Sequence, residues 1–198
     1  KKGVEYVEIR TLDINPFLLV GLDEEQLRVL DSFLLFCLLS DSAEISSEEN
    51  NEIQSNLQKV ILEGRNPDLM LLQGGREITF ADKAKALLNK ISGSADLLDR
   101  AHFNTLYGEA LAQQLVKIEH PEKTPSGIIM ADIVNGFEFS ELMLKQAKRQ
   151  QQYFSTQPLS YGLEKELQQQ ALISLQQQKD LEAQDVDLQT AKSFLDFL

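Results

Sequence analysis

One short segment, residues 4–10, limits what this chain can fold into, because it has the pattern of a β-strand in a sequence that is otherwise helical. Its residues alternate between two faces: Val4, Tyr6, Glu8 and Arg10 on one, and Glu5, Val7 and Ile9 on the other. A period of two with β-branched and aromatic residues predicts a strand. Pro16 in "DINPF" ends it, since proline lacks an N–H donor and restricts the residue before it.

From residue 23 onward the sequence predicts mainly helix. Asp23 is a suitable N-cap, and an apolar stripe at helical spacing follows to about residue 41. The stripe comprises Leu27, Leu30, Phe33, Leu34, Cys37 and Leu38, and a core packing role is expected for the cysteine. Further helices are predicted at about 47–63, 79–100, 104–119, 125–134, 138–154, 161–182 and 188–197, with a break left open at "SGS", residues 92–94. Thr124 followed by Pro125 marks a clean helix start.

Glycines carry two further expectations. Gly64 is expected to end the helix at 47–63 in the left-handed conformation. Gly74 and Gly75 are expected to form the two-residue turn of a short hairpin. They are not a phosphate loop, because no Gly-Lys-Ser/Thr follows them. The predicted fold class is α+β: mostly helical, with an N-terminal strand that belongs to an antiparallel sheet and a small hairpin.

The charge of the chain argues against two classes of partner. The formal net charge is −12, whereas a nucleic-acid backbone or an anionic membrane needs a basic face. The longest apolar run, "FLLFCLL", is far shorter than the ~20 residues of a membrane span, and no signal peptide is visible. The single cysteine fits a reducing compartment. We therefore expect a cytoplasmic protein without a nucleic-acid or membrane partner.

Glu8 and Arg10 are the candidate site residues. They lie two apart on the predicted strand, so both point to one face, about 6–7 Å apart along the chain. A carboxylate binds a hard cation such as Mg²⁺, and an arginine fork grips phosphate oxygens during phosphoryl transfer. For an isolated E-x-R tripeptide, however, a salt bridge on a solvated sheet face is the better explanation.

The longer sequence changes that balance. "VEIRTLDINPF" resembles the E-V-R-x-x-D-x-N-P stretch of glutamine synthetase-like carboxylate–amine ligases. With "GVEY" before it and "LDEEQLRVLDSFLLFCLLSD" after it, the chain resembles the C-terminal portion of proteobacterial-type glutamate–cysteine ligase. "VILEGRNPDLML" is similar to another stretch of that family, as are "TPSGIIMADIV", with departures from Gly127 onward, and the ending "AKSFLDFL".

The resemblance implies a reaction and site roles. The family joins the γ-carboxylate of L-glutamate to the amine of L-cysteine with ATP, through γ-glutamyl phosphate. Glu8 would be a Mg²⁺ ligand, and Arg10 would be the catalytic residue, in contact with the transferring phosphate or with the substrate carboxylate region. Most other metal ligands, the nucleotide pocket and the cysteine site come from earlier segments in that family. Residues 1–22 are thus expected to be the last part of the catalytic sheet and its following turn, and 23–198 a helical region, inactive alone.

Two questions of organisation stay open. The competing hypothesis is a non-catalytic helical interaction module, with the glutamine-rich stretches at 150–152, 168–170 and 176–178 as its binding surface. A solvated helix face is the favoured explanation of those glutamines. The natural chain could also continue into a glutathione synthetase domain, as in fused enzymes. An unpaired strand edge would in addition allow self-association.

The remaining polar candidates have simpler explanations. Asp13 and Asn15 are expected to be turn formers, because their side chains bond to their own backbone. Arg65 follows a helix end, where a cation is favourable with or without an anionic ligand, so its role stays open. His102 and His120 are isolated and are expected at the surface or at helix ends.

Overall fold

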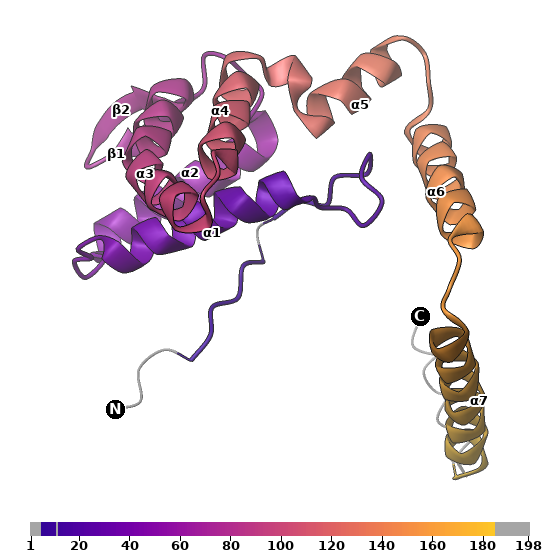
Figure 1. Cartoon of the computed structure of the whole chain (residues 1–198). Helices are drawn as coiled ribbons and strands as arrows, with labels where there is room; N and C mark the ends of the chain where they lie inside the picture. The colour runs from indigo at the N-terminus through magenta and orange to yellow at the C-terminus, as the bar shows by residue number, and fades with distance from the viewer. Residues whose placement is uncertain (1–4, 11, 185–198) are drawn as a thin grey trace. The chain divides into compact units, whose positions relative to one another are not determined.

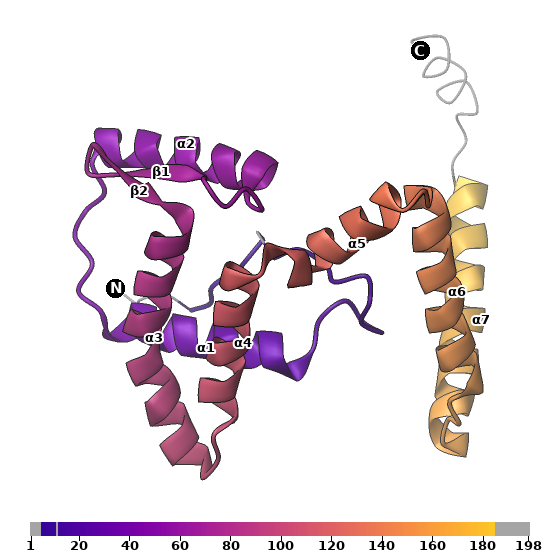
Figure 2. The same cartoon turned by 90° about the horizontal axis from the view of Figure 1, so that it is seen from above.

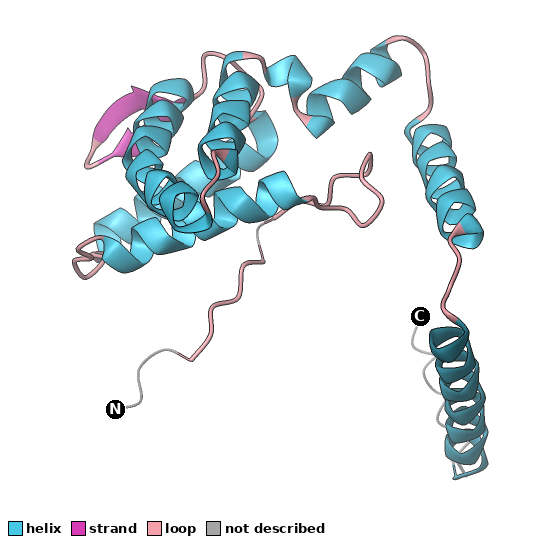
Figure 3. Cartoon of the chain, viewed as in Figure 1, coloured by secondary structure: helices cyan, strands magenta, loops and turns pink. Residues whose placement is uncertain are grey.

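The structure is a computed structural model that describes residues 5–10 and 12–184. Its described part is mostly helical with one two-stranded antiparallel sheet, so the predicted α+β class is confirmed (Figures 1 and 3). The elements in chain order are α1 (Glu24–Leu39), α2 (Ser47–Glu63), β1 (Met70–Gln73), β2 (Arg76–Thr79), α3 (Phe80–His102), α4 (Leu106–Glu119), the 3₁₀-helix η1 (Pro121–Lys123), α5 (Pro125–Val134), α6 (Phe139–Thr156) and α7 (Tyr161–Gln184).

The chain divides into two units, Lys1–Gln150 and Gln151–Leu198. The first unit holds the core. Helices α3 and α4 form a helical hairpin that lies across α1 (Figure 2). Ile91, Ala95 and Leu111 are buried where these three helices meet. In the second unit, the described side chains of α7 are all exposed.

Two helix starts follow from local chemistry as predicted. Asp23 accepts a hydrogen bond from the Gln26 N–H at 2.9 Å, and the Gln26 side chain accepts one from the Asp23 N–H at 3.3 Å. This capping box satisfies two otherwise unpaired donors of α1. The Thr124 hydroxyl accepts a bond from the Gly127 N–H at 3.0 Å, with Pro125 at the first position of α5.

The predicted buried face of α1 is wrong in part. Val29, Phe33 and Phe36 pack onto the core cluster, and Ser32 is fully buried, donating its hydroxyl to the Arg28 carbonyl oxygen. The cysteine expected in the core, Cys37, is exposed. Exposed with it are Leu27, Leu34 and Leu38 of the predicted stripe. The physical reason is that α1 is apolar on two sides, so periodicity alone does not decide which side the core covers.

The glycine predictions have different outcomes. Gly74 and Gly75 have φ of +60° and +75° and join β1 to β2, in the register Gln73 opposite Arg76, so the hairpin is confirmed. Gly64 is not left-handed; its φ and ψ are −56° and −17°. A Cβ there would lie 2.6 Å from the Val60 carbonyl oxygen, so close approach of the backbone, not positive φ, calls for glycine.

Other predictions on the helices were close to the structure. The break left open at residues 92–94 does not occur, because α3 continues unbroken through "SGS", with Ser94 buried. Helix α4 begins at Leu106, two residues later than predicted, and η1 was not predicted. The helix predicted at 188–197 lies outside the described residues. Within the described ranges, no helix has the length and apolar character needed to cross a membrane.

The predicted N-terminal strand is not formed in the structure. Residues 5–10 are exposed and carry no strand assignment. A strand is defined by its ladder of hydrogen bonds, and the described part of the chain supplies no neighbouring strand to this segment. Its membership of a catalytic sheet, and the functional division at residue 22, stay predictions.

Candidate functional site

Glu8 and Arg10, the predicted site residues, form a two-pronged ion pair. The Nε of Arg10 lies 2.9 Å from Oε1 of Glu8, and its Nη2 lies 2.9 Å from Oε2. The two side chains therefore lie together, as their spacing of two predicts. They are 80% and 57% exposed for Arg10 and Glu8, respectively. The pair is thus open to a ligand and contributes little to stability by itself.

The surroundings of this pair do not make a complete metal site. Mg²⁺ prefers an octahedron of oxygen ligands, commonly one or two carboxylates with water and phosphate oxygens. Across residues 5–10 and 12–184, no group of three or more His, Cys, Asp or Glu side chains is placed to hold a metal ion. Glu8 therefore stands as a single carboxylate, already paired with Arg10. The described residues alone do not fit a magnesium centre.

The other predicted residues near the pair are spread out. Tyr6 is 82% exposed, and Glu5 is exposed as well. Arg65 lies exposed in the loop between α2 and β1, on a different part of the chain from Glu8 and Arg10. Among the described residues, neither Arg65 nor Tyr6 makes a hydrogen bond or ion pair with Glu8 or Arg10.

A closed turn follows the segment and fixes the start of α1. Asn15 Oδ1 accepts a bond from the Phe17 N–H at 3.0 Å, and the Asn15 N–H donates to the Gly21 carbonyl at 2.8 Å. Gly21 has φ of +82°, and a Cβ there would lie 2.5 Å from Cγ2 of Ile14. The turn-forming role predicted for Asn15 is confirmed.

Gln150 holds this turn and is half-buried, so the solvated helix face expected for the stretch 150–152 is wrong at this residue. Its Nε2 donates to the carbonyl oxygens of Pro16, at 3.1 Å, and Leu18, at 2.8 Å. Both carbonyls belong to the loop that links the segment of Glu8 and Arg10 to α1. The local pattern around Gln150 gives no signal of this contact, because its partners are more than 130 positions away.

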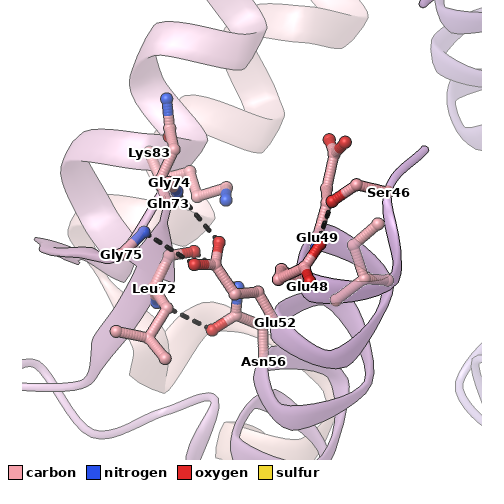
Figure 4. Close-up of a pocket in the computed structure, with 11 residues that line it drawn as sticks. Ser46, Glu48, Glu49, Glu52, Asn56, Leu72, Gln73, Gly74, Gly75 and Lys83 are labelled. Atoms are coloured by element: carbon pink, nitrogen blue, oxygen red, sulfur yellow. Dashed lines mark hydrogen bonds between the residues drawn. The ribbon is translucent and has the colours of Figure 1, made fainter. Parts of the chain in front are cut away.

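A second polar cluster lies where α2 covers the free edge of β1 (Figure 4). Asn56 accepts a bond from the Leu72 N–H at 2.8 Å and donates to the Leu72 carbonyl at 2.7 Å. Lys59, one turn further along α2, donates to the Met70 carbonyl at 3.0 Å. These side chains take the place of a neighbouring strand and satisfy the backbone of the edge.

Glu52, one turn earlier on α2, completes the cluster at the hairpin turn. Its two carboxylate oxygens accept bonds from the Gly74 N–H at 2.9 Å and the Gly75 N–H at 2.6 Å (Figure 4). The hollow beside it measures about 480 Å³, with Ser46, Glu48, Glu49 and Lys83 also in its lining. Because the polar side-chain atoms of Glu52 and Asn56 are hydrogen-bonded to the backbone of the hairpin, we interpret this cluster as a structural clamp that holds the hairpin against α2.

Two glutamates, Glu119 and Glu48, have lowered pKa values, and an ion pair and helix-end hydrogen bonds explain them. Lys85 Nζ lies 2.9 Å from Oε1 of Glu119, and this hydrogen bond and charge lower the pKa of Glu119. A hydrogen bond from its own backbone, and a smaller one from the Ser46 hydroxyl, lower the pKa of Glu48. Both acids are exposed and lie at helix ends, so neither has the raised pKa expected of a general acid.

Asp99 of α3 caps the helix that follows it. Its two oxygens accept bonds from the Tyr107 N–H at 2.8 Å and the Gly108 N–H at 2.9 Å. The carboxylate thus satisfies first-turn donors of α4, whose own N-cap, Thr105, makes no such bond. His102, in the last turn of α3, stacks on Tyr107 at 5.6 Å between ring centroids.

The histidine predictions are confirmed in position. His102 lies in the last turn of α3 and is exposed, and His120 is the C-cap of α4. His120 Nδ1 lies 3.2 Å from an oxygen of Glu122, also exposed. Among the described residues, neither ring is hydrogen-bonded to a serine, threonine or cysteine side chain.

Comparison with known proteins finds similarity to glutamate–cysteine ligases. A family model described as glutamate–cysteine ligase matches residues 1–60. The curated glutamate–cysteine ligase of Pseudomonas paraeruginosa is 40% identical over 191 residues, which are 96% of this chain and 36% of the relative. That of Shewanella pealeana is 40% identical over 185 residues, 93% of this chain and 35% of the relative. The chain thus spans about a third of the length of these relatives.

A solved structure agrees with these relatives. The 2.0 Å crystal structure of the glutamate–cysteine ligase of Francisella tularensis, in complex with AMP, matches with a TM-score of 0.77 and 28% identity. The match covers 92% of this chain and 36% of that one. The resemblance to the C-terminal portion of a proteobacterial-type glutamate–cysteine ligase, predicted from the sequence, is confirmed.

Proposed function

We propose that this chain is the C-terminal portion of a glutamate–cysteine ligase, an ATP-dependent carbon–nitrogen ligase that catalyses the first step of glutathione biosynthesis. The observation that carries the proposal is similarity at 40% identity over 96% of the chain. The AMP in the Francisella tularensis enzyme supports ATP as the co-substrate. The competing hypothesis of a non-catalytic interaction module is not favoured, because the similarity to glutamate–cysteine ligases extends over 96% and 93% of this chain.

In the proposed reaction, an oxygen of the L-glutamate γ-carboxylate attacks the γ-phosphorus of ATP and ADP leaves. The amine of L-cysteine then attacks the γ-carbonyl carbon, phosphate leaves, and the amine loses a proton. Developing negative charge on the transferring phosphoryl group has to be stabilised at fixed positions. The planar guanidinium of Arg10 suits that task, because it offers paired donors to phosphate oxygens.

Glu8 has two roles in this proposal. Its ion pair orients the Arg10 fork in the absence of phosphate, at 2.9 Å for both contacts. In the complete ligase Glu8 would supply one oxygen ligand to Mg²⁺, an ion that neutralises phosphate charge when bound. The other ligands would come from the part of the ligase outside this chain, because the described residues do not make up a site. We propose in addition that this ligase is located in the cytoplasm.

The direct test uses the complete ligase that contains this segment and the 198-residue chain beside it. ADP release and γ-glutamylcysteine, identified by mass spectrometry, are measured with L-glutamate, L-cysteine and Mg-ATP. We expect product from the complete ligase only. Failure of the complete protein to form product would overturn the ligase assignment. Phosphate release by the isolated chain that requires both amino acids would instead show that the chain carries a whole active site.

A further inference from the structure

The turn at residues 15–21 is the first part of the chain after Arg10 that hydrogen bonds hold in place. Only residues 11–14 separate Arg10 from this turn. Among the described residues, the Asn15 N–H is the first backbone group after Arg10 that makes a hydrogen bond, to the Gly21 carbonyl oxygen at 2.8 Å. The position of the turn therefore limits where the chain before it can lie.

Helix α6 holds this turn from a distant part of the sequence. One face of α6 and the turn enclose a hollow of about 450 Å³, and the helix residues that line it are Met143, Gln146, Ala147 and Gln150. Gln150 makes the polar contacts, because its Nε2 donates to the carbonyl oxygens of Pro16, at 3.1 Å, and Leu18, at 2.8 Å. Among the described residues, no other hydrogen bond joins α6 to the turn.

These two contacts require a hydrogen-bond donor at position 150. A carbonyl oxygen only accepts hydrogen bonds, so the amide has to present its NH₂ group, which has one N–H for each of the two carbonyls. Gln150 is half-buried, so the loss of this donor would leave the two carbonyls poorly satisfied. A carboxylate at this position would place further acceptors against them. An ammonium group would keep the donation, as Lys59 does for the Met70 carbonyl oxygen.

We propose that Gln150 is a positioning residue for phosphoryl transfer, because it holds the turn that fixes one end of the segment of Glu8 and Arg10. The inference rests on the proposed function. Both side chains would act on charge that develops in the transition state, which requires fixed positions before the reaction. A displacement of about 1 Å can lower a rate on the order of 10²-fold. Among the described residues, segment 5–10 makes no backbone hydrogen bond of its own, so the turn is the part of this chain that sets its position.

The test compares steady-state kinetics of the complete ligase with those of its Gln150→Glu, Gln150→Ala and Gln150→Lys variants. We expect Gln150→Glu to lower kcat at least about tenfold and to change the KM for L-cysteine by less than about twofold, since the catalytic groups are displaced and the cysteine site is not. Gln150→Ala should lower kcat less, because it adds no acceptor. Gln150→Lys should keep kcat within about threefold, because it keeps a donor. The Mg²⁺ concentration for half-maximal rate should rise with Gln150→Glu, since Glu8 is a proposed ligand.

Two control variants separate positioning from a loss of stability. Asn56→Ala removes another amide that bonds to two backbone groups, those of Leu72 in the hairpin. It should lower the thermal midpoint and leave kcat unchanged. Gln151→Ala changes the adjacent, exposed glutamine of α6 and should alter neither. Hydrogen–deuterium exchange of residues 15–21 in the same complete proteins should be faster in Gln150→Glu than in the unchanged ligase, and unaltered in both controls.

The outcomes separate this inference from the proposed function. An active ligase in which Gln150→Glu leaves kcat unchanged would overturn the positioning role and leave the ligase assignment intact. So would a loss of kcat that Gln150→Lys or Asn56→Ala shares in full, or exchange of residues 15–21 that Gln150→Glu does not alter. A complete protein that forms no γ-glutamylcysteine would overturn the ligase assignment, and the positioning role with it.

Discussion

The side chain of Asn56 pairs with both backbone groups of Leu72, at 2.8 Å for the donated N–H and 2.7 Å for the carbonyl. One residue of α2 thus makes the two bonds that a neighbouring strand would make. Asn56→Ala should lower the free energy of unfolding by about 1–3 kcal/mol, because it leaves both part-buried groups without a partner. Urea unfolding followed by circular dichroism measures this loss. Asn51→Ala, at an exposed position of α2, is the control and should change stability little.

Substitutions of Glu8 and Arg10 test their proposed roles in the complete ligase. Glu8→Gln removes a charged oxygen ligand and keeps the shape, so it should raise the Mg²⁺ requirement and lower turnover. Arg10→Lys keeps the charge but loses the planar fork. It should raise the activation free energy of phosphoryl transfer by roughly 2–4 kcal/mol, as removal of one preorganised hydrogen-bond donor does.

Glu5→Gln is the internal control for that pair, because alternation along an extended segment places Glu5 opposite Glu8. Its effect on turnover should be mild. Steady-state rates at saturating and limiting Mg²⁺, on variants shown to be folded, give the comparison. If Glu5→Gln were as damaging as Glu8→Gln, the facing of the segment and the assignment of Glu8 as a metal ligand would both be wrong.

Asp99 stabilises the turn between α3 and α4 through its bonds to Tyr107 and Gly108. Asp99→Ala should cost about 0.5–2 kcal/mol, the range for loss of a helix cap. The thermal midpoint of the chain reports it. Asp96→Ala changes an exposed carboxylate three residues earlier on α3 and should leave the midpoint nearly unchanged. Equal losses from the two variants would mean that charge, and not capping, is responsible.

The ion pair of Lys85 and Glu119 makes a small, pH-dependent contribution to stability. Its hydrogen bond and charge lower the folded pKa of Glu119 below the ordinary value of 4.5. The contribution is therefore fully present above pH 4.5 and is lost as pH falls through the lower folded pKa. Lys85→Met should destabilise the chain slightly at pH 7, less at high salt, and progressively less as the pH falls below 4.5. The measurement is the thermal midpoint of the unchanged chain and of Lys85→Met between pH 7 and pH 3. A difference between the two midpoints that stays constant with pH would contradict a stabilising ion pair.

Local rules predicted those parts of the fold that depend on neighbours in sequence. The cap at Asp23, the start at Thr124 and the turn at Gly74 and Gly75 each follow from residues within a few positions. The closeness of Glu8 and Arg10 follows in the same way from their spacing of two. Their proposed chemistry does not; it comes from the resemblance.

Contacts between distant residues were beyond the local pattern. Glu52, Asn56 and Lys59 show the spacing of one helix face, but nothing in the sequence of α2 says that this face meets a strand edge. The contact of Gln150 with the loop at Leu18 is equally hidden. The buried side of α1 could not be chosen either, because apolar residues occupy two of its sides and only the placement of α3 and α4 decides between them.

Helix α2 covers the edge of β1, so the two edges of the hairpin differ in how readily another strand can pair with them. The Met70 carbonyl is engaged by Lys59, and both backbone groups of Leu72 are engaged by Asn56, so an incoming strand would have to displace these side chains to pair with β1. Among the described residues, α2 packs against β1 and not against β2. The contacts of Asn56 and Lys59 thus protect the chain from edge-to-edge association through β1, whereas α2 gives no such cover to β2, Arg76–Thr79.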